Sequence, residues 1–323
     1  MRRTQGFTLI ELMVAVAILV IVVAAVMQNL VFQSRAYTVV DQTTEAQQNG
    51  RAIADLLERE IRLTGFMVPE EAALCGIDNT NASDVVVLTN ADVIDPDDEF
   101  RAEMGAEILV GVVGVGSRTF TLEGLMLEGK GFYDLDGDTV GDSDFQENMG
   151  VLVYDADDAS VGTACGIITD VSLAGNSITV DFLTTFAPAG GDELRAVPAN
   201  IYQVDANMQL LRNNTVLAGN VEDLQVSYFL DLDDDGQMNP ATEDFGSAAG
   251  PNYTAAGTDH SSLREIRLNV VLRARDADAN QASGLSTFQA TENRAPDPTS
   301  DGFRRRVQTV TSRTRNVGAR GSS

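Results

Sequence analysis

The feature that most constrains this chain is one long apolar run near its N-terminus. Residues Phe7 to Met27 read FTLIELMVAVAILVIVVAAVM, without proline or glycine and with a single charged residue, Glu11. As an uninterrupted helix, a run of this length spans roughly 30 Å, about the thickness of the hydrocarbon core of a bilayer. We therefore expect a transmembrane segment over residues 7–27.

The residues on either side of the run indicate how it is oriented in the membrane and whether it is cleaved. Arg2 and Arg3 precede it, and the positive-inside rule places them in the cytoplasm. A secretory signal peptide would have a small-residue cleavage site after the run, which residues 29–35 do not offer. An ordinary signal anchor remains an alternative, but it does not explain Glu11, because an unpaired carboxylate in a membrane span is costly.

The residues Gly6-Phe7-Thr8-Leu9-Ile10-Glu11 resemble the type IV prepilin signature. The resemblance implies a leader over residues 1–6, cleavage between Gly6 and Phe7 by a prepilin peptidase, and methylation of the new N-terminus. It also implies that Glu11 acts in assembly, where its carboxylate would pair with the N-terminal ammonium of a neighbouring subunit. A buried charge is tolerated when it is paired in this way.

The helix is expected to continue beyond the membrane. Between Gln28 and Leu63 there is no proline and one glycine, Gly50, which is either a mild kink or a weak position. Apolar residues recur every three or four positions in the second half, at Ile53, Leu56, Leu57 and Ile61. With Gly65 as a stop signal, we expect one helix over residues 7–65 whose second half packs on a globular head.

The remainder, residues 66–323, reads as a β-rich extracytoplasmic head. Short runs rich in Val, Ile, Thr and Phe predict strands at 84–88, 118–122, 150–154, 166–173, 177–183, 200–204, 223–230, 264–273 and 305–311. Several alternate apolar and polar residues, as antiparallel strands with one exposed face do. The predicted fold is α+β and type IV pilin-like: one long helix packed on an antiparallel sheet with long insertions.

Both ends of the chain resemble PilW-type minor pilins. The resemblance lies in residues 47–66, in Asn220–Tyr228, and in the runs Leu263–Arg275 and Phe303–Arg315; residues 67–200 show none. It implies a low-copy subunit that primes assembly of a type IV pilus or sits at its tip, with other minor pilins and the major pilin as partners. The expected location is the inner membrane, as a single-pass protein, and then the cell surface.

Two cysteines, Cys75 and Cys165, both follow the predicted membrane span. Disulfides persist outside the cytoplasm, so we expect these two residues to form one, which would restrain the unrecognised middle of the chain. Two unpaired buried thiols are the alternative.

Two acidic loops, at residues 134–147 and 231–243, repeat one pattern. Each places acids at loop positions 1, 3 and 5 and an Asp or Asn at position 9, with a glycine that permits a tight turn, as calcium loops do. We expect a calcium ion in each; ordinary surface turns are the alternative. The candidate ligands are Asp134, Asp136, Asp138, Asp142 and Asp144 in the first loop, and Asp231, Asp233, Asp235, Gln237, Asn239 and Glu243 in the second.

Composition narrows the function classes. The chain has a formal net charge of −26, which argues against nucleic acid as a partner. With one histidine and two cysteines, no catalytic set built on these residues is credible, and we predict that the protein is not an enzyme. A minor pseudopilin of a type II secretion system and a pilus-tip adhesin remain alternatives; a membrane-anchored hydrolase is the least favoured.

Overall fold

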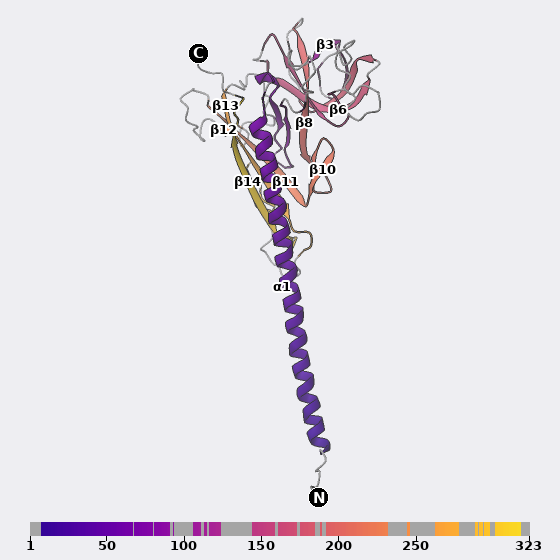
Figure 1. Cartoon of the computed structure of the whole chain (residues 1–323), viewed down its shortest axis with the longest axis vertical. Helices are drawn as coiled ribbons and strands as arrows, with labels where there is room; N and C mark the ends of the chain where they lie inside the picture. Colours follow the sequence, from indigo (N-terminus) through magenta and orange to yellow (C-terminus); the bar gives the residue numbers. More distant parts are fainter. Residues whose placement is uncertain are drawn as a thin grey trace.

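The protein consists of a long N-terminal helix that projects from a β-rich head (Figure 1). The structure, a computed structural model, describes residues 8–66, 68–79, 81–90, 93, 106–110, 113–114, 116–123, 144–158, 161–172, 175–184, 188, 192–231, 244–245, 262–277, 288–289, 291–292, 294–297 and 301–317.

Helix α1 runs without interruption from Leu9 to Leu63. Its first half is exposed, whereas its second half buries a stripe with helical spacing that faces the sheet: Gln42, Gly50, Ile53, Ala54, Leu57, Glu60 and Ile61. A β-carbon on Gly50 would lie 2.8 Å from Cδ1 of Leu272. At Gly50 the helix therefore lies close against the sheet, a packing role that neither sequence interpretation, a mild kink or a weak position, included.

The C-terminal end of the helix is held by the end of the chain. Thr64 is the C-cap, and Gly65 follows with φ +75°, a left-handed conformation that favours glycine. The side-chain amide of Asn316 donates to the carbonyls of Arg62 and Thr64 at 3.3 Å each. Val317 is 1% exposed beside Gly65. Carbonyls that a helix end leaves unsatisfied are thus bound by residues more than 250 positions away.

A four-stranded antiparallel sheet lies under the second half of α1. Its order is β12 (Asp244–Phe245), β11 (Val221–Leu230), β13 (Leu263–Arg273), β14 (Arg305–Arg313). Helix α1 packs on β13 and β14 (Figure 1). The core between them contains Leu57 and Ile61 from the helix with Leu268, Val270 and Val310 from the strands.

The other sheet begins with a 3-10 turn, Glu70–Ala72, and the strands β1 (Leu74–Ile77) and β2 (Val85–Leu88). The strand β8 (Leu194–Val204) pairs with β2 and with β9 (Gln209–Arg212), which turns back into β10 (Thr215–Gly219). These strands lie on the side of the head nearer to the helix (Figure 1).

The first half of β8 also belongs to a small closed barrel. Strands β3 (Ala106–Val110), β4 (Gly116–Leu122), β7 (Ser177–Phe182), β6 (Thr163–Ser172) and β5 (Gly150–Asp155) pair in that order, and β8 closes the ring by pairing with both β3 and β5. Side chains fill its interior, among them Phe120 and Phe182, whose rings stack edge to face at 5.5 Å. The barrel is a packed core at the end of the head farthest from the N-terminus (Figure 1).

The predicted fold class is confirmed, because one long apolar helix carries an antiparallel head. Each of the nine predicted strands overlaps a strand of the structure. The sequence missed β1, β3, β9, β10 and β12, which are five residues or shorter. The predicted strand at 200–204 covers only the second half of β8, which begins at Leu194. The first half includes Pro198, a residue uncommon in strand interiors, which pairs with Val151.

Candidate functional site

The N-terminal start of α1 is built by a capping box. The backbone N–H and the hydroxyl of Thr8 donate to the Glu11 carboxylate at 2.9 Å each, and the N–H of Glu11 donates to the Thr8 hydroxyl at 3.3 Å. The Thr-x-x-Glu spacing is the sequence signal for this motif. The sequence analysis expected Glu11 to act in assembly and did not predict its role as a helix cap. Gly6 and Phe7, the predicted cleavage and methylation site, lie outside the described residues.

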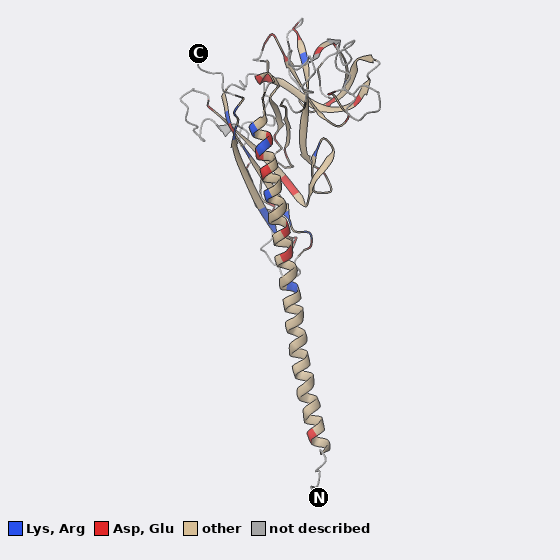
Figure 2. Cartoon of the chain, in the orientation of Figure 1, with Lys and Arg blue, Asp and Glu red and all other residues tan. Residues whose placement is uncertain are grey.

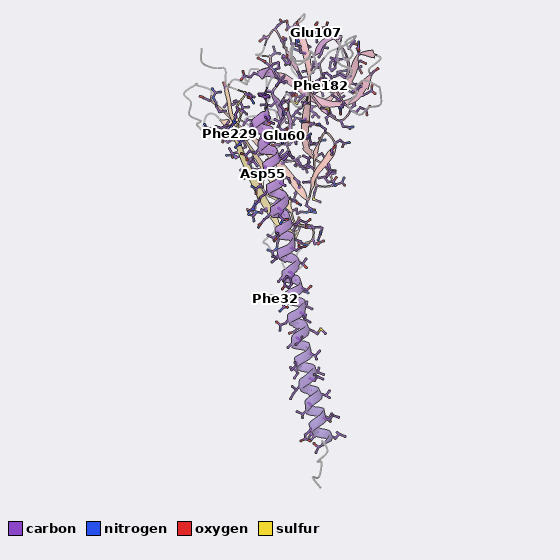
Figure 3. All side chains as sticks on the ribbon, in the orientation of Figure 1. Phe32, Asp55, Glu60, Glu107, Phe182 and Phe229 are labelled. Atoms are coloured by element: carbon purple, nitrogen blue, oxygen red, sulfur yellow. A yellow bond between two sulfur atoms is a disulfide. The ribbon has the colours of Figure 1, made fainter. Side chains whose placement is uncertain are left out.

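The side chains on either side of Glu11 form an exposed apolar surface. Leu9, Ile21 and Phe32 are 76%, 69% and 73% exposed, and Phe32 lies on the part of α1 that projects away from the described part of the head (Figure 3). By length and composition this helix can cross a membrane. Charged side chains gather on its second half, where the head begins (Figure 2).

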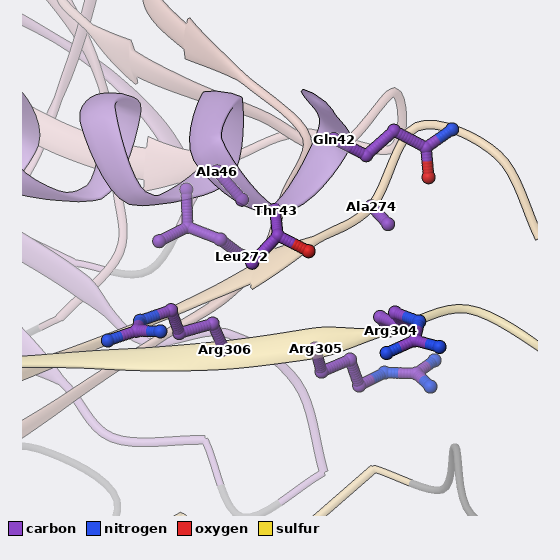
Figure 4. Close-up of a pocket in the computed structure, with 8 residues that line it drawn as sticks. All are labelled: Gln42, Thr43, Ala46, Leu272, Ala274, Arg304, Arg305 and Arg306. Atoms are coloured by element: carbon purple, nitrogen blue, oxygen red, sulfur yellow. The ribbon is translucent and has the colours of Figure 1, made fainter. Parts of the chain in front are cut away.

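Where the helix meets the lower end of the sheet, helix residues and the arginines at the start of β14 line a pocket of about 410 Å³ (Figure 4). The lining residues are Gln42, Thr43, Ala46, Leu272, Ala274, Arg304, Arg305 and Arg306. Arg305 is already engaged, because its guanidinium forms ion pairs with Glu222 and Asp301. These carboxylates raise the pKa of Arg305 further above its usual range.

The predicted disulfide is present. Cys75 on β1 and Cys165 on β6 are bonded, with a Cα–Cα distance of 6.2 Å, and both residues are fully buried. The bond joins strand β1, beside the helix, to strand β6 of the barrel. Both cysteines lie within residues 67–200, so the bond restrains the unrecognised middle of the chain from within.

Most of the candidate calcium ligands lie outside the described residues. Of the candidate ligands, only Asp144 and Asp231 are described; Asp134, Asp136, Asp138, Asp142, Asp233, Asp235, Gln237, Asn239 and Glu243 are not. Asp231 is 2% exposed and accepts a hydrogen bond from Nε of Arg264 at 3.3 Å. Within the described part of the chain, no three His, Cys, Asp or Glu residues come together as a metal site would need. Calcium binding therefore stays a prediction.

A buried polar cluster, which the sequence did not predict, joins the two sheets. The Asp84 carboxylate, before β2, accepts the backbone N–H groups of Asn79 at 2.8 Å and of Val226 on β11 at 2.7 Å. Asp223, also on β11, is fully buried and pairs with Arg294 at 2.5 Å. Burial raises the pKa of Asp84 to about 7 and also raises the pKa of Asp223.

Comparison with known proteins agrees with both resemblances. Residues 1–27 match the prokaryotic N-terminal methylation motif, and residues 190–316 match the type IV pilus-assembly protein W family. A solved type IV-like pilin from Thermus thermophilus aligns over 86% of this chain and 98% of its own, with 13% identity and a TM-score of 0.29. Comparison with curated proteins gives no match. The chain thus combines an N-terminus that matches the methylation motif of prepilins with a C-terminal region that matches the type IV pilus-assembly protein W family.

Proposed function

We propose that the protein is a minor pilin: a low-copy subunit, trimmed after Gly6, that primes assembly of a type IV pilus or stands at its tip. The observation that carries this proposal is one continuous helix, Leu9–Leu63, which begins inside the methylation motif and ends packed on strands of the pilus-assembly domain. Such a subunit waits in the inner membrane and then joins other minor pilins and the major pilin.

A terminal position in the pilus is supported by the size and shape of the head. The barrel adds a second body beyond the sheet that α1 covers (Figure 1). Repeated packing along a shaft would have to accommodate this body at every turn, whereas a subunit at the tip has free space above it.

Two alternatives make different predictions. A minor pseudopilin of a type II secretion system typically lacks the glutamate that matches Glu11, so the capping-box residue favours a pilus. The barrel at the far end of the head favours an adhesin displayed on the pilus (Figure 1). Binding of the isolated head to glycans or host cells would test this alternative. Pilus-assembly proteins are structural, which agrees with a protein that has no catalytic role.

We also propose that calcium binds the loops at 134–147 and 231–243 and stabilises the head. The support is the acidic pattern of the sequence, since closely spaced carboxylates repel one another unless a cation neutralises them.

Deletion of the gene and rescue with variants tests the assembly role. We expect deletion to remove surface pili and the wild-type gene to restore them, as counted by electron microscopy. Glu11 has two candidate roles, helix capping and pairing with a neighbouring ammonium, and two substitutions separate them. Glu11→Gln retains a capping-box side chain but loses the charge, whereas Glu11→Ala loses both.

If charge pairing drives assembly, both variants fail to restore pili although both reach the membrane. Restoration by Glu11→Gln alone would show that capping is the required role. Normal piliation in the deletion strain would contradict the assembly role and leave display or secretion as the better explanation.

A further inference from the structure

The outer strand of the small sheet, β14, has one edge that no strand of the described residues covers. It pairs with β13 from Arg305 to Arg313, and no described strand pairs with its other side. An unpaired edge presents a row of backbone donors and acceptors that an additional strand can bind.

The pairing register identifies the groups that face outward. Residues of an antiparallel strand direct their backbone N–H and C=O alternately to one side and the other. The N–H of Ala274 donates to the carbonyl of Arg304 at 2.8 Å, and the N–H of Thr314 donates to that of Arg264 at 3.2 Å. The backbone N–H and C=O groups of the even-numbered residues of β14 therefore point towards β13. The outward groups belong to the odd-numbered residues: Arg305, Val307, Thr309, Thr311 and Arg313.

This edge is accessible. Val307 is 41% exposed, and the side chains of Thr309, Thr311 and Arg313 are exposed as well. A large β-branched side chain and two threonines are residues that suit a paired strand. The edge can therefore accept another strand, and its length is that of an ordinary strand.

The charge on this edge is unusual for an acidic protein. Arg304, Arg306, Arg313 and Arg315 are exposed along β14 and its ends, where no Asp or Glu occurs between residues 303 and 323. Arg306, Arg313 and Arg315 form no ion pair with a described residue. At the start of the strand, Arg304 and Arg306 also border the pocket beside Thr43 (Figure 4).

The same charge determines which strand can bind. If two copies paired antiparallel through β14, centred on Thr309, Arg305 would lie opposite Arg313 of the other copy. Like charges directly opposite each other are destabilising, whereas opposite charges stabilise a cross-strand pair. In this register the edge disfavours a second copy of this chain, although Glu222 and Asp301 partly neutralise Arg305. The arginines that form no ion pair with a described residue, Arg306, Arg313 and Arg315, favour an acidic strand.

We propose that the β14 edge binds an extended acidic segment of another pilus subunit, which adds to the sheet as a fifth strand. The outward backbone groups supply the hydrogen bonds, and the exposed arginines select the partner. The pocket receives an acidic side chain from the end of the segment. This inference rests on the proposed function, because it takes the partner from the same pilus.

The test uses the full chain in the rescued deletion strain, with a photo-cross-linking residue in place of Val307. Thr311→Pro removes one outward N–H and leaves the pairing with β13 intact, whereas the matched control, Thr311→Ala, retains that N–H. Arg306→Glu reverses a charge without replacing a hydrogen-bonding group, and its control is Arg118→Glu, an exposed arginine of the barrel. Mass spectrometry identifies the cross-linked peptide.

We expect a peptide rich in Asp and Glu from another pilus subunit, with a yield that falls roughly fivefold to tenfold in Thr311→Pro and in Arg306→Glu and stays constant in both controls. If Thr311→Pro does not accumulate in the membrane, Arg306→Glu decides. Equal yields in all variants, or cross-links to a second copy, would overturn the inference. Loss of pili on deletion with unchanged cross-linking would refute only the edge, whereas normal pili on deletion would refute the proposed function.

Discussion

Gly50 shows how one residue determines the distance between helix and sheet. An added β-carbon would meet only the terminal Cδ1 of Leu272, at 2.8 Å, and next Cβ of Gln308 at 3.7 Å. A side-chain end can move by a few tenths of an ångström, whereas a second or third carbon would push the helix away from the strands.

We therefore predict opposite results for two substitutions at this position. In Gly50→Ala the gain in helix propensity, about 1 kcal/mol, offsets the contact with Leu272, and the free energy of unfolding stays within about 1 kcal/mol of wild type. Gly50→Leu overpacks the interface and costs about 1–3 kcal/mol. Urea denaturation of detergent-solubilised protein measures both, and equal stability of the two variants would contradict the close approach.

Asp84 makes the stability of the head depend on pH. Its pKa is about 7 in the folded protein and 3.8 when unperturbed, so between these values the folded state binds the extra proton. The contribution of Asp84 to the free energy of unfolding is therefore greatest below about pH 4. It decreases by about 2–4 kcal/mol as the pH rises towards 7. Melting temperatures across that range should show a steeper decrease in wild type than in Asp84→Asn. Parallel curves would assign the slope to other groups.

At the scale of elements, local pattern was enough to find the long helix and nine strands, but it did not give their pairing. The turn between β9 and β10 had a readable signal, since Asn213 and Asn214 both have positive φ (50° and 62°). The barrel had none, because its closure depends on the two partners of β8. The cluster around Asp84 and Asp223 joins segments about 140 positions apart, which no local pattern encodes.

The disulfide is the covalent link between the elements that the sequence could assign and those that it could not. Cys75 and Cys165 are 90 positions apart, and removing a cross-link that closes a loop of this size costs about 4.6 kcal/mol in the chain-entropy model. We predict this loss for the double variant Cys75→Ala/Cys165→Ala in urea denaturation.

Wild-type protein treated with a reductant under denaturing conditions and refolded should lose a similar amount. A difference below about 1 kcal/mol between oxidised and double-variant protein would show that packing alone holds the barrel in place.

For the whole molecule, the negative charge predicts a response to calcium. If each acidic loop binds one ion with a Kd near 10⁻⁴ M, as extracellular calcium modules do, 10 mM calcium stabilises the head by about 2.7 kcal/mol per loop. We predict a higher melting temperature with calcium than with a chelator, and a rise about half as large in Asp233→Asn/Asp235→Asn, which removes ligands of the second loop alone. The control is Asp170→Asn, an exposed acid on β6, and an equal rise in the control and the double variant would mean general charge screening.

The shared strand β8 has a mechanical consequence. Its first half is part of the barrel and its second half pairs with β2 and β9 beside the helix. A load applied to the barrel would therefore travel along one backbone into the lower sheet and pull the hydrogen bonds to β2 in shear, where several must break together. The Cys75–Cys165 bond gives a second, covalent connection between the barrel and the lower sheet. The far end of the head is therefore attached in a way that resists a pulling force.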